Sequence, residues 1–253
     1  MSAPASRHAG VRVTDPTDIA RALTVVREHA ASRANTTDMS HPATPASTLD
    51  QTRAAPALPV HDAFSGLLPW TGLRRGTVVS LVGSTLLALA LLGAASEQGS
   101  WCAAIGMPDL GLTAAADAGI VLSRFALVPH PGEQWVEVTG ALLDGFDAVI
   151  IRPPARPTDR IASLLAARAR QRGAVLLPIT ADWPSSDLTL SVTAHQWHGL
   201  GRGHGRLRHT DITISSHGKG SAGRPRDTVI RLPLSAGLPA PDATTAGRHL
   251  RAV

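Results

Sequence analysis

The sequence of 253 residues is poor in several features on which common functions depend. It has one cysteine, Cys102, so no disulfide can form within the chain. It has no run of about 18 apolar residues, which a membrane-spanning helix needs, and it begins without the apolar segment of a secretory signal. We therefore expect a cytoplasmic protein, with the nucleoid as an alternative location.

Lysine and tyrosine are also scarce, because Lys219 is the single lysine and tyrosine is absent. All other strong bases are arginine, and the net charge is +5. One interpretation is the codon bias of a GC-rich genome, which favours alanine, arginine, glycine and proline. The other is a surface that meets nucleic acid or an acidic partner. A charge of this size on so long a chain does not separate the two.

Four segments are expected along the chain. Residues 1–34 predict an N-terminal helix, capped by Asp15, and residues 35–59 predict a flexible linker rich in threonine, proline, alanine and serine. Residues 60–234 form the predicted core, followed by a flexible tail over 235–253. The helix carries one apolar stripe, a candidate partner-docking surface, formed by Ile19, Leu23 and Val26.

Apolar strands alternate with helical patterns through the first part of the core. This order predicts an α/β fold with a mainly parallel central sheet and helices on both faces. The expected strands lie at 77–82, 100–107, 125–131, 146–154 and 174–180, and the expected helices at 85–99, 111–120, 132–145 and 158–173.

The helical patterns stop after residue 186. Alternating apolar residues within 187–200, 209–220 and 227–234 predict three strands joined by glycine-rich turns. Short turns of this kind favour antiparallel pairing, so we expect hairpin strands at the C-terminal end of the core.

The segment from 80 to 101 has the strand–turn–helix order of a phosphate-binding loop. Such a loop needs several backbone N–H groups, a lysine for the phosphates and a hydroxyl for Mg²⁺. Here only Gly83, Ser84 and Thr85 stand in its place, and residues 1–218 contain no lysine. Weak anion binding at the helix N-terminus stays open, but hydrolysis is not expected.

A second expected element is a carboxylate at the end of the strand over 146–154. Arg152 stands there instead, and a cation would repel Mg²⁺. Two interpretations of this side chain are open. It is a surface arginine beside two prolines, or it fills the vacated phosphate pocket.

Histidines gather near the predicted hairpin, at 195, 198, 204, 209 and 217. Only His195 and His198 are closely spaced, and no cysteine lies nearby, so the sequence predicts no metal site. It also shows no arrangement for nucleophilic catalysis. Cys102 lies in an apolar strand and is interpreted as a small core residue.

The same region is the densest basic segment of the chain. Trp197 adds a surface on which a base can stack. The alternatives are a solvated hairpin and a DNA contact, for which clustered arginines are suited. The candidate DNA-binding residues are Arg202, Arg206, Arg208, Lys219, Arg224 and Arg226.

Taken together, these motifs resemble the RecA core over about residues 60–233. The resemblance rests first on GLLPWTGLRRGTVVSLVG, before the shortened loop, and on PGEQ at 131–134. It rests further on LLDGFDAVIIRPP, which contains the expected strand over 146–154, and on DITISSHGKG with DTVIRLP at the late hairpin. Among RecA-like proteins the chain is most similar to the actinobacterial ImuA and ImuA-prime mutasome accessory proteins, which are related to SulA.

The resemblance implies a RecA-like core that has lost its ATPase residues. The lysine is absent, Arg152 replaces an aspartate, and Pro108 lies where a catalytic glutamate is expected, with Asp109 displaced beside it. It implies no catalytic residue, no cofactor and a role in translesion DNA synthesis. The implied partners are an ImuB-like polymerase-related protein and, through it, an error-prone DNA polymerase alpha subunit. Alternatives are a SulA-like cell-division inhibitor, a DNA-binding RecA-like protein and an active recombinase.

Overall fold

The computed structural model describes residues 56–200, 205–219 and 224–234. The predicted N-terminal helix with Ile19, Leu23 and Val26, the predicted tail over 235–253 and most of the predicted linker lie outside these residues. The packed part of the chain begins slightly earlier than the expected residue 60. Leu58 is buried and exchanges two backbone hydrogen bonds with Leu73, at 2.8 and 2.9 Å.

The expected alternation of strands and helices is present. The strands are β1 (Val79–Val82), β2 (Cys102–Ile105), β3 (Phe125–Val128), β4 (Ala148–Ile151) and β5 (Val175–Pro178), and the helices are α3 (Thr85–Glu97), α4 (Leu112–Asp117), α5 (Trp135–Gly145) and α6 (Asp159–Arg172). Strands β3, β2, β4 and β5 form one sheet in that order, and every pair in it is parallel.

A second sheet has the order β1-β6-β7-β8 and includes the three late strands β6 (Leu188–Leu200), β7 (Gly205–Gly218) and β8 (Arg226–Leu232). β1 pairs with β6 in parallel, whereas β7 is antiparallel to both of its neighbours. Parallel bridges from Val78 to Leu176 and from Leu81 to Ile179 join β1 to β5, so the two sheets meet edge to edge. The predicted fold class, α/β with a parallel sheet and late antiparallel strands, is confirmed.

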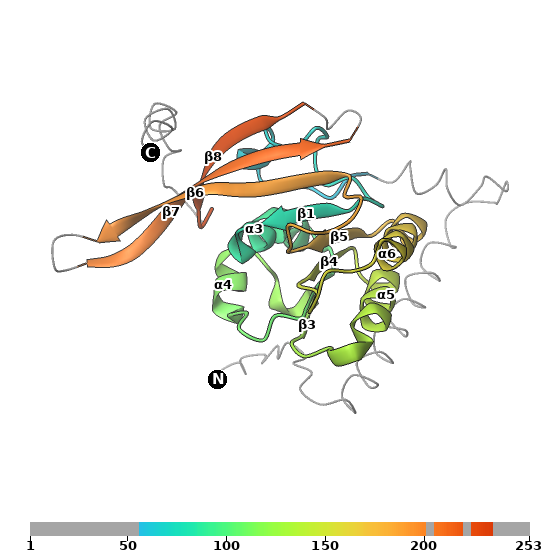
Figure 1. Cartoon of the computed structure of the whole chain (residues 1–253). Helices are drawn as coiled ribbons and strands as arrows, with labels where there is room; N and C mark the ends of the chain where they lie inside the picture. The colour runs from blue at the N-terminus through green and yellow to red at the C-terminus, as the bar shows by residue number, and fades with distance from the viewer. Residues whose placement is uncertain (1–55, 201–204, 220–223, 235–253) are drawn as a thin grey trace, which may run out of the picture.

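Each short strand of the parallel sheet is buried on both faces. In β2, Cys102 and Ala104 belong to the apolar cluster that includes α3, while Ala103 and Ile105 belong to the cluster that includes α5 and α6. Figure 1 shows α3 and α4 on one side of this sheet and α5 and α6 on the other. Two-sided burial explains why these strands read as continuous apolar runs rather than alternating ones.

Local sequence signals set the helix ends. Ser84 and Thr158 cap α3 and α6 through their side-chain oxygens, and Gly173 ends α6 in the left-handed region with φ 64°. The predicted helix over 132–145 begins as a 3-10 turn, because Gly132 has φ 58°, and α5 proper starts at Trp135. Among the described residues, no helix combines the length and apolar character required to cross a membrane.

β6 and β7 are much longer than the strands of the parallel sheet. Near the core their inward residues, Leu188, Leu190, Ile212 and Ile214, are buried. A bulge lies between Val192 and Ala194, and residues 193–197 beyond it are exposed. Figure 1 shows this two-stranded ribbon projecting beyond the rest of the molecule. We call residues 193–200 and 205–213 the ribbon; its inner part, residues 210–213, still pairs with β8, and the rest projects.

Candidate functional site

A very short turn joins β1 to α3 at the candidate phosphate site. It consists of Gly83 and Ser84 only, because β1 ends at Val82 and α3 begins at Thr85. Gly83 has φ 91°, a conformation that a glycine adopts without strain. Ser84 Oγ accepts a hydrogen bond from the Leu87 N–H at 3.2 Å, so one of the free N–H groups at the start of α3 is already used.

The carboxyl ends of the parallel strands bring Arg152 to this turn. Arg152 follows β4 directly, and its Nη2 donates a hydrogen bond of 2.7 Å to Thr85 Oγ1. Its Nη1 lies 3.8 Å from the carboxylate of Asp109, whose side chain is 81% exposed. Gly106, after β2, allows the close approach of the neighbouring strands, since a Cβ there would meet the Arg152 carbonyl oxygen.

The hydrogen bond to Thr85 Oγ1 places the guanidinium of Arg152 beside the turn between β1 and α3. The side chain is still 39% exposed, so it closes the site from the solvent side rather than from within the core. The arrangement places a permanent positive charge next to the first turn of α3. The carboxylate that pairs with this charge is that of the exposed Asp109.

Cys102 has the surroundings of a core residue, as the sequence predicted. It is fully buried in β2, and burial together with the nearby Asp147 carboxylate raises the pKa of its thiol to about 12. Asp147 itself is held by Arg75 Nη1 at 2.9 Å and by the Trp101 N–H at 2.9 Å. A protonated, buried thiol is unsuited to nucleophilic chemistry.

The predicted basic segment divides between two distant places. Arg208 is exposed on the ribbon, whereas Lys219, Arg224 and Arg226 lie at the connection from β7 to β8. Because β7 is extended, the eleven residue-to-residue steps from Arg208 to Lys219 span about 35 Å at about 3.3 Å per step. Arg202 and the side chain of Arg206 lie outside the described residues. The members of the segment that the structure describes therefore do not make one continuous patch.

Trp197 is one of the most exposed large apolar side chains that the structure describes. It is 56% exposed, and its ring is nearly parallel to that of His195, with 6.5 Å between centroids. Both side chains lie on the same face of the ribbon, because β-strand side chains alternate. This face continues the apolar face of β6 beyond the point where the core covers it.

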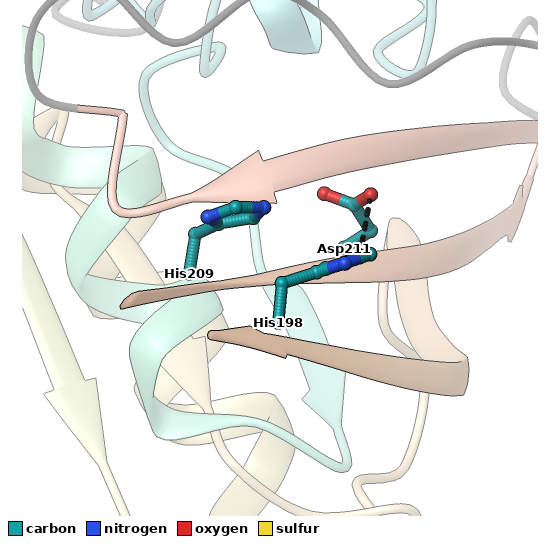
Figure 2. A group of neighbouring side chains, drawn as sticks. All are labelled: His198, His209 and Asp211. Atoms are coloured by element: carbon teal, nitrogen blue, oxygen red, sulfur yellow. Dashed lines mark ion pairs between the residues drawn. The ribbon is translucent and has the colours of Figure 1, made fainter. Parts of the chain in front are cut away.

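A polar cluster that the sequence did not predict occupies the opposite face of the ribbon. His198 and His209 face each other across β6 and β7, and their rings stack with 4.6 Å between centroids. His198 Nε2 lies 3.2 Å from Asp211 Oδ2. Asp211 is also held from β8 by Arg231, at 2.7 Å from Nε and 2.9 Å from Nη2. Figure 2 shows the histidines and Asp211 side by side.

The charges of this cluster influence one another. The hydrogen bonds and charge of Arg231 lower the pKa of Asp211, against the smaller opposing effect of burial. Partial burial and the Arg231 charge lower the pKa of His209. The sequence shows these histidines in one region, but their spacing along the chain does not reveal which of them face each other. Pairing the two strands around the turn at 201–204 is the step that brings His198 opposite His209.

Two comparisons find similarity between part of this chain and known proteins. Residues 66–185 match the model of the MT3502 N-terminal domain family. Over 112 residues the chain is 41% identical to a protein of Mycobacterium tuberculosis named Uncharacterized protein Rv3395c. The aligned region covers 44% of this chain. The chain spans about half the length of that curated relative, since the match covers 55% of it. The part of the chain that contains β1 to β5 is thus similar to the MT3502 N-terminal domain family.

Proposed function

We propose that the protein is a non-catalytic adaptor with a RecA-like core, acting in an error-prone translesion DNA synthesis complex. One observation carries the non-catalytic part of this proposal, the hydrogen bond from Arg152 to Thr85 at the remnant loop. The assignment to translesion synthesis rests on the resemblance to ImuA-prime proteins described above.

The geometry of the β1–α3 turn supports the loss of nucleotide binding. A phosphate-binding loop surrounds the phosphates with successive backbone N–H groups. A connection made of Gly83 and Ser84 has no room for such a loop, and Ser84 turns its side chain back to cap α3. Thr85, the remaining candidate for a Mg²⁺-binding hydroxyl, instead accepts from Arg152.

The charge at the site supports the same conclusion. Phosphoryl transfer needs Mg²⁺ near the phosphates, held by a strand-end carboxylate in this class of enzyme. Arg152 provides a cation at the strand end, and a unit charge at about 4 Å repels another by several kcal/mol near a protein surface. Asp109 is too exposed, at 81%, to offset this strongly.

Nucleotide binding by the full-length protein tests this part of the proposal. We expect no saturable binding of a fluorescent ATP analogue with Mg²⁺ up to about 1 mM, the upper end of ordinary Michaelis constants. Turnover of radiolabelled ATP that disappears in Thr85→Ala would overturn the proposal. A matched control is Thr158→Ala, which removes a helix-capping hydroxyl far from the loop along the chain.

Co-purification tests the adaptor role. We expect the full chain to retain an ImuB-like partner, and a version without residues 1–34 to lose it if the N-terminal helix is the docking element. A finer variant changes Ile19, Leu23 and Val26 to alanine, and its control changes Arg21 and Arg27 on the other face of the predicted helix. Failure of the full chain to retain the partner would contradict the adaptor role.

A second candidate function, DNA contact, is favoured by the exposed Trp197 on the ribbon with Arg208 on the neighbouring strand. Aromatic rings that accept stacked bases, together with arginines that contact phosphates, are typical of single-strand binding. We expect binding to single-stranded DNA that weakens steeply with salt and weakens further in Trp197→Ala. Leu164→Ala is a matched control, because Leu164 is equally exposed, at 56%, on α6. Equal effects of the two substitutions would exclude the ribbon as the contact.

A further inference from the structure

We propose that the ribbon carries a transition-metal site of the zinc class, in which His198, His209 and Asp211 bind one divalent ion. The site would tie β6 to β7 where the ribbon leaves the core. This proposal does not depend on the adaptor role or on translesion synthesis.

Strand register brings the three side chains together. His198 and His209 are direct partners in the β6–β7 pairing, and Asp211 follows His209 by two residues, which places it on the same face. One ligand atom from each residue can be chosen so that all three atoms lie within 4.8 Å of one another. Figure 2 shows the three side chains converging from two adjacent strands.

Two buried ring nitrogens of this cluster have no hydrogen-bond partner among the described residues. They are Nε2 of His198 and Nδ1 of His209. His198 Nε2 is close enough to Asp211 for an ion pair, at 3.2 Å, but does not make a well-directed hydrogen bond. Buried polar atoms are nearly always satisfied, so such a pair calls for a bound ion or water. A single metal ion would satisfy both nitrogens.

Small side-chain rotations are enough to close the site. Zinc binds histidine nitrogen at about 2.0–2.1 Å, so two ligand nitrogens on one ion lie roughly 3.3 Å apart. The ligand atoms already lie within 4.8 Å of one another. The side chain of His198 is 32% exposed, so solvent borders part of its ring.

Arg231 has two opposing effects on the site. It holds both oxygens of Asp211, at 2.7 and 2.9 Å, and so fixes the orientation of the carboxylate. A carboxylate has about four lone-pair positions, so these two bonds leave positions for a metal. Outer partners of this kind commonly orient metal ligands. The guanidinium also repels a cation, so we expect weaker binding than in a closed four-ligand zinc site.

The donor set selects the class of ion. Two imidazoles and one carboxylate suit Zn²⁺ and its neighbours in the transition series, whereas Mg²⁺ and Ca²⁺ prefer oxygen ligands throughout. Three protein ligands leave the fourth tetrahedral position for water or for a group from a partner. The site would thus link two neighbouring strands through one ion and leave one coordination position open.

Metal titration of the full-length, untagged protein tests the proposal. We expect one equivalent of Zn²⁺ by calorimetry, and one equivalent of Co²⁺ with the visible absorption bands of a tetrahedral ion. His198→Gln and His209→Gln should each weaken binding by at least about tenfold, the lower end of the effect of altering a metal site. His195→Gln is the matched control, because His195 lies on the same strand but on the opposite face.

Each outcome decides the proposal. Wild-type protein that develops no Co²⁺ bands at a metal concentration well above that of the protein overturns it, whatever the variants do. Binding that is unchanged in His198→Gln and His209→Gln also overturns it, and equal loss in His195→Gln assigns the metal to other histidines. If a variant fails to fold, thermal unfolding of the wild type decides instead, since a bound ion must raise its melting temperature.

Discussion

Replacing Arg152 by alanine removes the hydrogen bond that closes the remnant loop. Its Nη2 donates to Thr85 Oγ1 at 2.7 Å, and the substitution leaves that hydroxyl without this donor. The ion pair with Asp109 is also lost, at 3.8 Å from a side chain that is 81% exposed. Exposed ion pairs of this kind contribute little, so the hydrogen bond should account for most of the effect.

The expected size follows from the exposure of the guanidinium. A hydrogen bond to a charged group stabilises a protein by about 1.5–3 kcal/mol when it is well buried. The Arg152 side chain is 39% exposed, so water replaces part of the interaction in the variant. We therefore expect a loss of about 0.5–1.5 kcal/mol in the free energy of unfolding. For a domain of this size, this loss lowers the melting temperature by about 1–6 °C.

A double-mutant cycle with Thr85→Val isolates the contact from other effects of each substitution. Urea unfolding of the wild type, both single variants and the double variant gives the coupling energy, which we expect to equal most of the loss in Arg152→Ala. Arg156→Ala, at an exposed arginine on the same connection, is the control and should leave stability unchanged. A coupling below about 0.3 kcal/mol, within the error of additivity, would refute the contact.

Three further predictions concern other parts of the structure. The thiol of Cys102, with a pKa of about 12, should react with a thiol reagent at pH 8 only after denaturant unfolds the protein, and rapid reaction of the native protein would contradict its burial. The pairing of Asp211 with Arg231 lowers the pKa of the carboxyl below its ordinary value. This stabilisation is therefore fully present above the ordinary pKa and is lost as pH falls through the lowered one. Unfolding curves should therefore show a difference between wild type and Asp211→Asn that is largest near neutral pH and shrinks in acid, and a difference independent of pH would contradict it. Gly106→Ala should lower stability by more than about 2 kcal/mol, because Gly106 has φ 75° and a Cβ would meet the Arg152 carbonyl, and an unchanged melting temperature would contradict this.

The strands and helices of the core could be predicted because their signals are local. The apolar runs of β2, β4 and β5 are buried on both faces, so they show no alternation that could be confused with a surface strand. The expected helices over 85–99 and 158–173 lie close to the observed α3 and α6. The exact ends were less predictable, as the 3-10 turn before α5 illustrates, because they depend on backbone angles such as that of Gly132.

The sites were harder to predict because they depend on contacts between distant parts of the chain. The sequence placed Arg152 at a strand end but left open where its side chain would point, since 67 residues separate it from Thr85. The cluster of His198, His209 and Asp211 needs the register of β6 and β7, and its fourth member, Arg231, comes from a third strand. A single-residue shift of that register would put His209 on the other face of the ribbon.

The burial of α3 explains how the core can keep its shape without a nucleotide. This helix is apolar nearly all round. The seven residues from Leu87 to Gly93, together with Ala95 and Ser96, are buried between the sheet and the segments around it. Its packing therefore contributes to stability whether or not a ligand binds at its N-terminus. Ser84 and Thr85 are only partly buried, so substitutions there act mainly on the first turn of α3 and less on the core.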